Sequence, residues 1–211
     1  MRILLITKRT LIMTVLIIAV IIVALILLLT KGSGENTQAS STGAIEEYEL
    51  NVLAGKQRVL PVYSVNRQDK KIALTIDAAW EDDKTPFILE ELKKYDIKAT
   101  FYMCGFWVDK YPEHIKEIYA AGHELGNHSA THPHMSKLAA SQIEKEVKAL
   151  DDKIEALVGA RCKTFRAPFG EYNDTVVSTI RGMGYEVVQW SIDTIDWKEE
   201  RSAQTILDTV T

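Results

Sequence analysis

The chain has 211 residues, of which 46% are hydrophobic and 26% charged, with 25 basic side chains against 29 acidic ones. This length and composition fit one anchored domain of ordinary size. The net charge of −4 gives no basic face for phosphate groups, so we expect no nucleic acid partner. The sequence also has no Gly-rich phosphate loop and no GxSxG elbow, which argues against a nucleotide ligand and against a serine hydrolase.

The N-terminal residues predict a membrane anchor. Residues 10–30 contain no charged side chain and are almost entirely apolar, which is long enough to cross a bilayer. Arg2, Lys8 and Arg9 precede this run, and positive charge favours the cytoplasmic side. A buried core helix is disfavoured because the run is apolar on all sides. We therefore expect a cytoplasmic N-terminus at 1–9, an uncleaved transmembrane signal anchor at 10–30, and an extracytoplasmic domain held at the cell membrane by a single pass.

The rest of the chain predicts an α/β domain. Residues 31–47 are rich in Gly, Ser and Thr and form a flexible linker, and residues 48–211 form the domain, beginning with β-prone segments up to residue 65. Strands and helices then alternate, which is typical of an α/β fold. The predicted strands cover 71–76, 97–103, 123–126, 163–166 and 186–192. The predicted helices cover 85–95, 112–121 and 174–183, with further helices beginning at 141 and 202.

Local signals refine this picture. Ser141 followed by Glu144 predicts a capping box at the start of a helix, and Gly122 predicts a left-handed helix end. Cys104 and Cys162 could form one disulfide outside the cytoplasm. Without a CxxC pattern, two separate buried thiols are favoured.

Polar residues follow several predicted strands. Asp77, the turn that contains His128, Arg166 and Asp193 each lie at or just past a strand end. The carboxyl ends of parallel strands in a barrel meet on one face, where active sites are built. We therefore expect these groups to lie together.

Four of the five histidines fall within residues 123–134. His128 and His132 are four residues apart, so one helical turn, or a turn entering one, would bring both rings to the same side. Two neutral imidazoles make a good partial shell for a divalent transition metal. The alternative is a polar loop with solvated histidines. Among the others, His123 is expected to be structural, and His134 is expected near the surface or behind the metal ligands.

Four segments together resemble the polysaccharide deacetylase (NodB-homology) family, the family 4 carbohydrate esterases. They are residues 74–77 (LTID), 128–132 (HSATH), 166–170 (RAPFG) and 193–197 (DTIDW). The amino-acid sequence of residues 77–80, 105–108 and 168–173 is similar to that of the sporulation-associated, PdaB-like branch of Gram-positive bacteria. The resemblance implies a distorted (β/α) barrel. It also implies removal of N-acetyl groups from amino sugars of peptidoglycan or a chitin-like polysaccharide.

The resemblance implies a role for each matched position. Asp77 would be the general base, and Arg166 would orient it. Asp193 would tune the catalytic acid. The metal ligands would be His128 and His132, holding zinc, with cobalt, nickel or manganese as alternatives. Two further positions would contact substrate: the backbone N–H of Phe169 would stabilise the oxyanion, and Trp197 would line the groove with Asp193.

Two positions depart from the family pattern. The family has a second aspartate after the first strand, a metal ligand, and here that place is Ala78. Residues 81–83 (EDD) could supply the missing carboxylate, although ordinary solvated loop charges are the favoured interpretation. The family also ends on a strand with Leu-x-His, whose histidine is the general acid, and no histidine follows Trp197 here. We therefore expect either a truncated chain, with the last strands missing, or an enzyme that lacks its acid. A catalytically impaired relative that binds glycan or has a structural role in the envelope or spore is therefore the second hypothesis. A non-glycan amidase or esterase is a third, supported by shared chemistry alone.

Overall fold

A computed structural model describes residues 58–80 and 84–211 of the chain. The chain divides after Gly55, and the described residues belong to the second unit, Lys56–Thr211. The predicted cytoplasmic segment 1–9, anchor 10–30 and linker 31–47 lie outside the described residues. Among the residues that the structure does describe, no helix is long and apolar enough to cross a membrane.

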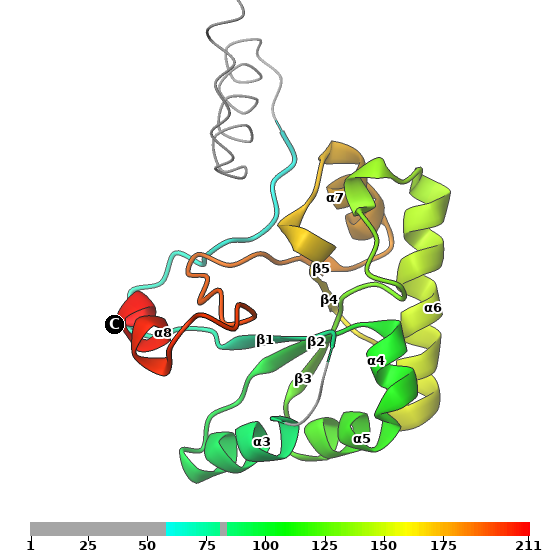
Figure 1. Ribbon diagram of the computed structural model, residues 1–211. Coiled ribbons are helices and arrows are strands. Elements are labelled where there is room, and N and C mark those ends of the chain that lie inside the picture. The colour runs from blue at the N-terminus through cyan, green and yellow to red at the C-terminus, as the bar shows by residue number, and fades with distance from the viewer. Residues whose placement is uncertain (1–57, 81–83) are drawn as a thin grey trace, which may run out of the picture. The chain divides into compact units, whose positions relative to one another are not determined.

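The second unit is built on one parallel sheet (Figure 1). Its strands, in the same order in space as in sequence, are β1 Thr75–Ala78, β2 Thr100–Met103, β3 Glu124–Asn127, β4 Thr164–Phe165 and β5 Glu186–Val187. Val62 adds one parallel bridge to Val188 beyond β5. Successive strand–helix units produce this order, so the predicted α/β class is confirmed. A closed barrel would also join β1 to the far edge, and no such pairing occurs within 58–80 and 84–211.

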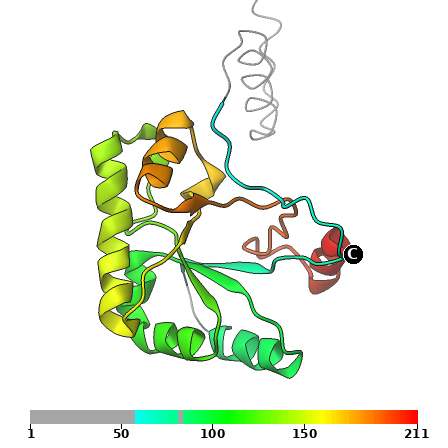
Figure 2. The same cartoon turned by 180° about the vertical axis from the view of Figure 1, so that it is seen from behind.

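Helices connect the strands and cover the sheet. Those in the described part of the chain are α3 Thr85–Lys94, α4 Gly105–Lys110, α5 Pro112–Ala120, α6 Ala140–Val158, α7 Asp174–Gly182 and α8 Ala203–Val210, with 3-10 turns η1 Met135–Lys137 and η2 Pro168–Gly170. The longest, α6, packs against α4, α5 and α7 (Figures 1 and 2). By contrast, α8 has no buried residue.

The apolar face of α6 forms much of the core. Its fully buried side chains are Ile143, Val147, Leu150 and Ile154, at the three- and four-residue spacing that predicted them. The predicted start of this helix was wrong. The backbone is still extended at Ala139, and the side chain of Gln142 accepts its N–H at 2.9 Å. The side-chain bond to the helix start therefore lies two residues earlier than the predicted capping box, and it is one-sided because Ala139 has no side-chain acceptor.

Four of the five strands, β1, β2, β4 and β5, are shorter than predicted. The run 71–76 gives way to β1 at 75–78, and Ile72 is 93% exposed. Among the described strands, β1 pairs only with β2, so an apolar run before it has no neighbour on its other side. The predicted strand 186–192 ends at Val187, and the isolated bridge to Val62 is the pairing recorded on its far side.

Other local predictions were mixed. The helix α4, which follows β2 at once, was missed. The helix ending before Gly122 was predicted correctly, and Gly122 has the left-handed φ of 78°. Cys104 and Cys162 are separate, free and buried, as favoured.

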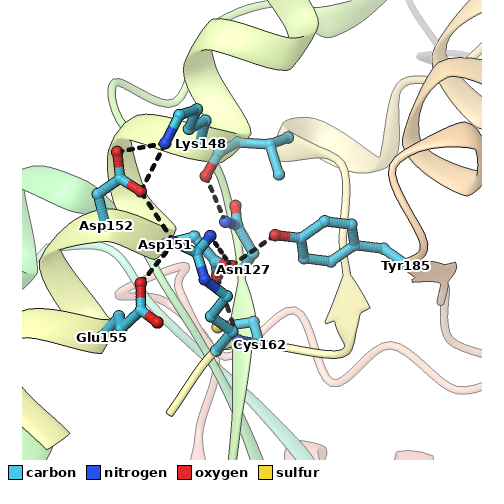
Figure 3. A network of polar contacts seen from close by, with 9 residues as sticks. Asn127, Lys148, Asp151, Asp152, Glu155, Cys162 and Tyr185 are labelled. Atoms are coloured by element: carbon cyan, nitrogen blue, oxygen red, sulfur yellow. Dashed lines mark hydrogen bonds and ion pairs between the residues drawn. The ribbon is translucent and has the colours of Figure 1, made fainter. Parts of the chain in front are cut away.

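One buried carboxylate joins three elements away from the strand ends (Figure 3). Asp151 on α6 is fully buried. Its Oδ2 accepts the Tyr185 hydroxyl at 2.6 Å, and its Oδ1 accepts the Cys162 N–H at 3.2 Å. Arg161 Nη1 lies 3.6 Å from Oδ2. These bonds satisfy a charge that burial alone would make costly, and they fix α6 to the segment before β4 and to the one before β5.

Candidate active site

The carboxyl ends of four neighbouring strands bring polar residues to one edge of the sheet. In the strand register Ala78 pairs with Met103, Met103 with Asn127, and Asn127 with Phe165. Asp77 is therefore beside the residues that immediately follow β3 and β4. These are His128 and Arg166, and the structure brings all three together as the sequence predicted.

Asp77 and Arg166 form an ion pair. Arg166 Nη1 donates to Asp77 Oδ1 at 2.6 Å, and Nη2 donates to Thr75 Oγ1 at 2.9 Å and to the Gln189 carbonyl at 3.3 Å. The Arg166 side chain is 3% exposed and that of Asp77 34%. The guanidinium also lies 4.1 Å from the centre of the Tyr102 ring. Several partners thus fix Arg166, and its hydrogen bond to Asp77 uses Oδ1 and not Oδ2.

His128 is oriented by the backbone. Its Nδ1 lies 2.8 Å from the Arg166 carbonyl oxygen, so Nδ1 carries the proton and Nε2 keeps a free lone pair. Nε2 lies 3.8 Å from Asp77 Oδ2. Burial lowers the pKa of His128 below its ordinary value, and the ring is therefore neutral at neutral pH. The contact with Asp77 is accordingly between a carboxylate and a neutral ring.

His132 comes from the same turn, residues 128–132, which we call the histidine turn. Its ring centre lies 5.1 Å from that of His128, with the rings at 73°. Burial, followed by the neighbouring His128, lowers the pKa of His132 to about 4. A helical turn was the wrong explanation for this pairing. Ser129 and His132 have left-handed φ values of 68° and 57°, and the Ser129 hydroxyl accepts the His132 N–H at 3.0 Å.

Two side chains that sequence reasoning missed hold the histidine turn. Asn127 is fully buried, donates to the Val147 carbonyl at 2.9 Å and accepts the Ser129 N–H at 2.9 Å. Glu146 accepts the Thr131 N–H at 2.8 Å and its hydroxyl at 2.9 Å. Both contacts tie the turn to α6. They link residues far apart in sequence, so a local pattern gives no signal for them.

The donor set fits a divalent transition metal. His128 and His132 each offer one neutral imidazole, and Cys104 offers a sulfur; their ligand atoms all lie within 4.8 Å of one another. Nitrogen and sulfur donors suit zinc and cobalt better than magnesium or calcium. Ala78 offers no side-chain donor, and residues 81–83 lie outside the described part of the chain.

Aromatic side chains surround His132. Phe169 lies between His132 and His134, with ring centres 4.5 Å from each, and is 55% exposed. Trp80 is 66% exposed, with its ring centre 5.5 Å from those of His132 and Phe106. These exposed faces are suited to sugar rings.

Three other aromatic and histidine side chains lie in the core or at the surface and not among the candidate metal ligands. Trp107 is fully buried in the core. His134 Nδ1 lies 2.9 Å from Glu171 at the surface, and His123 is a buried structural residue whose Nδ1 accepts the Ala99 N–H at 3.3 Å.

Asp193 does not follow a strand end, contrary to the prediction, because β5 ends at Val187. It is exposed in the following loop, and its Oδ1 accepts the Ile195 N–H at 2.9 Å. Trp197 is 72% exposed, with Lys198 Nζ 5.2 Å from its ring centre. The roles implied for Asp193 and Trp197 stay predictions.

Residues 64–188 match the family described as polysaccharide deacetylase. The chain belongs to the polysaccharide deacetylase family. The matched range contains Asp77, the histidine turn and Arg166, the residues that the structure assembles. The resemblance inferred from short motifs is therefore confirmed at the level of the family.

The curated relatives of this chain include two Bacillus proteins named as peptidoglycan deacetylases. The peptidoglycan-N-acetylglucosamine deacetylase of Bacillus cereus is 34% identical over 140 residues, covering 66% of this chain and 50% of the relative. The peptidoglycan-N-acetylmuramic acid deacetylase PdaA of Bacillus subtilis is 34% identical over 151 residues, covering 71% and 57%. The chain spans about half the length of the curated relatives it matches.

Solved structures of similar chains include both active and inactive proteins. BA3943 of Bacillus anthracis, described as a CE4 family pseudoenzyme, has a TM-score of 0.69 at 35% identity, covering 74% of this chain and 55% of that one. A mutant of it is described as having restored enzymatic activity. PdaA of Bacillus subtilis, a family 4 carbohydrate esterase, has a TM-score of 0.65 at 33% identity, covering 72% and 64%.

Proposed function

We propose that this chain is a metal-dependent hydrolase that removes N-acetyl groups from amino sugars of cell-wall polysaccharide, peptidoglycan or chitin-like. The observation that carries the proposal is the contact of Asp77 with both Arg166, at 2.6 Å, and His128, at 3.8 Å. A carboxylate held by a buried guanidinium beside two neutral imidazoles is the arrangement that amide hydrolysis at a metal requires. Membership of the deacetylase family supports this choice of reaction.

Each residue has a chemical task in this proposal. Arg166 orients Asp77, and Oδ2 of Asp77, which Arg166 does not contact, accepts the proton of the attacking water. His128 and His132 would hold a metal ion, which would lower the pKa of water toward ~7 and polarise the amide carbonyl. We propose zinc, with cobalt, nickel or manganese as alternatives. The backbone N–H of Phe169 stabilises the oxyanion, as the family resemblance implies.

Substrate binding uses the aromatic faces beside His132. Trp80 and Phe169 are exposed next to the metal ligand, so a sugar ring can stack there while its acetamido group reaches Asp77. Asp193 and Trp197 belong to the groove wall in this proposal. Their support is the resemblance of residues 193–197 to the family motif.

The location and the remaining fold features are also proposals. The uncharged apolar run 10–30 supports a single membrane anchor, with the domain on the extracytoplasmic side near its glycan. The sequential parallel strand order supports a barrel-like architecture. The sequence similarity of these short segments (77–80, 105–108 and 168–173) to the PdaB-like branch supports a role in spore formation.

A second candidate is a glycan-binding relative without activity. Ala78 favours it, because the family places a metal-binding aspartate there. The similarity to a protein described as a pseudoenzyme favours it too. This candidate keeps the aromatic faces as a binding surface and gives up turnover.

Acetate release decides between the two. The full 211-residue chain, purified in detergent and loaded with zinc, is incubated with peptidoglycan and with chitooligosaccharides. The deacetylase proposal expects acetate in amounts that fall at least about 100-fold in Asp77→Asn, a change that removes the base. Binding of the glycan without acetate release above that of Asp77→Asn would instead establish the second candidate.

A further inference from the structure

Cys104 lies between Ala78 and the histidine turn. It follows β2 directly, and its N–H donates to the Ala78 carbonyl at 3.1 Å. Its Sγ lies 3.4 Å from the His128 carbonyl oxygen, and the N–H of Gly105 donates to the Ser129 carbonyl at 3.1 Å. The cysteine is therefore adjacent both to the position that lacks the family's carboxylate and to the histidine turn.

Gly105 makes this closeness possible. A Cβ on Gly105 would lie 2.7 Å from the carbonyl oxygen of Ala130 and 2.9 Å from its Cα. Real Cβ atoms do not approach backbone atoms so closely, so a larger residue would separate the start of α4 from the histidine turn. The glycine thus lets Cys104 lie directly against the histidine turn.

The three donor atoms are close enough to share one ion. The ligand atoms of Cys104, His128 and His132 lie within 4.8 Å of one another. With Zn–N near 2.0 Å and Zn–S near 2.3 Å, ligand atoms of a tetrahedral site are about 3.5 Å apart. An ion would therefore draw them together by about 1 Å, a change within the reach of small side-chain rotations. Cys104 and His128 are also buried, which protects the sulfur from oxidation by solvent species.

We infer that Cys104 Sγ is the third protein ligand of the metal, in place of the carboxylate that Ala78 cannot supply. Binding replaces the S–H bond by a metal–sulfur bond and releases one proton to solvent. A thiolate ligand favours zinc and cobalt over manganese and magnesium, which narrows the metals considered above. It also leaves Asp77 free to act as the base. This inference rests on the metal site of the proposed function.

Cobalt provides a readout that is independent of activity. A thiolate bound to Co²⁺ gives a sulfur-to-cobalt charge-transfer band in the near ultraviolet, which imidazole and carboxylate ligands do not give. We expect this band from the full 211-residue chain loaded with cobalt. It should persist in Cys162→Ser, a matched control because Cys162 is also buried but belongs to the Asp151 network. It should vanish in Cys104→Ser, with the cobalt Kd raised at least about tenfold.

A second variant tests the exchange of ligands. Adding Ala78→Asp to Cys104→Ser should restore cobalt affinity without restoring the sulfur band. A double variant that binds no tighter than Cys104→Ser contradicts the inference. If the Cys104→Ser chain does not fold, the spectrum of the unmodified chain decides alone.

The outcomes separate this inference from the proposed function. An unmodified chain that binds one cobalt without a sulfur band overturns the role of Cys104, while the deacetylase proposal still depends on acetate release alone. A chain that binds no cobalt at all overturns both the metal site and the inference. Unchanged affinity in Cys104→Ser also overturns the inference.

Discussion

Replacing Arg166 by methionine tests how much the Asp77–Arg166 pair stabilises the folded domain. Methionine retains an apolar stem but loses every hydrogen bond of the guanidinium. The bond to the Asp77 carboxylate is charge-assisted and contributes about 2 kcal/mol, and the bonds to Thr75 and to the Gln189 carbonyl contribute about 1 kcal/mol together. Breaking a fully buried pair costs about 3–5 kcal/mol. Because Asp77 is 34% exposed, we expect about 3 kcal/mol, the low end of that range.

Urea unfolding of the full chain, followed by tryptophan fluorescence, measures this loss. The control is Lys148→Ala, which removes an exposed ion pair with Asp152 and should cost below about 1 kcal/mol. Combining Arg166→Met with Asp77→Asn should recover about 1–2 kcal/mol, because the unpaired carboxylate is then gone. If Arg166→Met costs no more than Lys148→Ala, or if the double variant recovers nothing, then the pair does not stabilise the site as argued.

Three other predictions concern the same domain. The pKa of His132 is lowered from 6.5 to about 4, so between those values the unfolded chain binds a proton that the folded site does not. The metal-free chain should therefore lose stability as pH falls through this window, with a flatter Tm profile in His132→Asn; equal slopes would contradict this. Gly105→Ala should raise the cobalt Kd about tenfold by moving the histidine turn. The control Gly182→Ala, whose added methyl group meets open space, should leave the cobalt Kd unchanged. Equal cobalt affinities in the two variants would refute the close approach at Gly105. Tyr185→Phe should cost about 2 kcal/mol in urea unfolding by leaving Asp151 short of a bond, at unchanged cobalt affinity, and no loss would mean that this hydrogen bond contributes little.

The sequence predicted the parts of the site that local pattern controls. Asp77, His128 and Arg166 each follow a short apolar segment, and parallel strand ends converge, so their meeting could be inferred without coordinates. The buried face of α6 followed from its spacing in the same way. Strand lengths could not be inferred. Ile72 is as apolar as a core residue, yet it is exposed before β1, which is an edge strand among the described residues.

The supporting residues depended on contacts across the fold. Asn127 and Glu146 act through bonds between the histidine turn and α6, which link positions 15 to 20 residues apart. Cys104 left a fainter signal, because it stands directly between an apolar strand and a glycine. The sequence predicted Cys104 to be a buried thiol or one half of a disulfide, because its nearness to the histidines appears only when β2 and β3 are paired.

Three residues at the site have a left-handed backbone, which lowers the stability of the fold but positions a proposed metal ligand. Ser129, His132 and Phe169 all have φ between 57° and 68°, a conformation that costs a side-chain-bearing residue about 1–2 kcal/mol. Selecting this chain for heat resistance would therefore favour glycine at Ser129, where the cost disappears. The same change would delete the hydroxyl that accepts the His132 N–H and loosen a metal ligand. A gain in stability at Ser129 would therefore come with weaker binding at the proposed metal site.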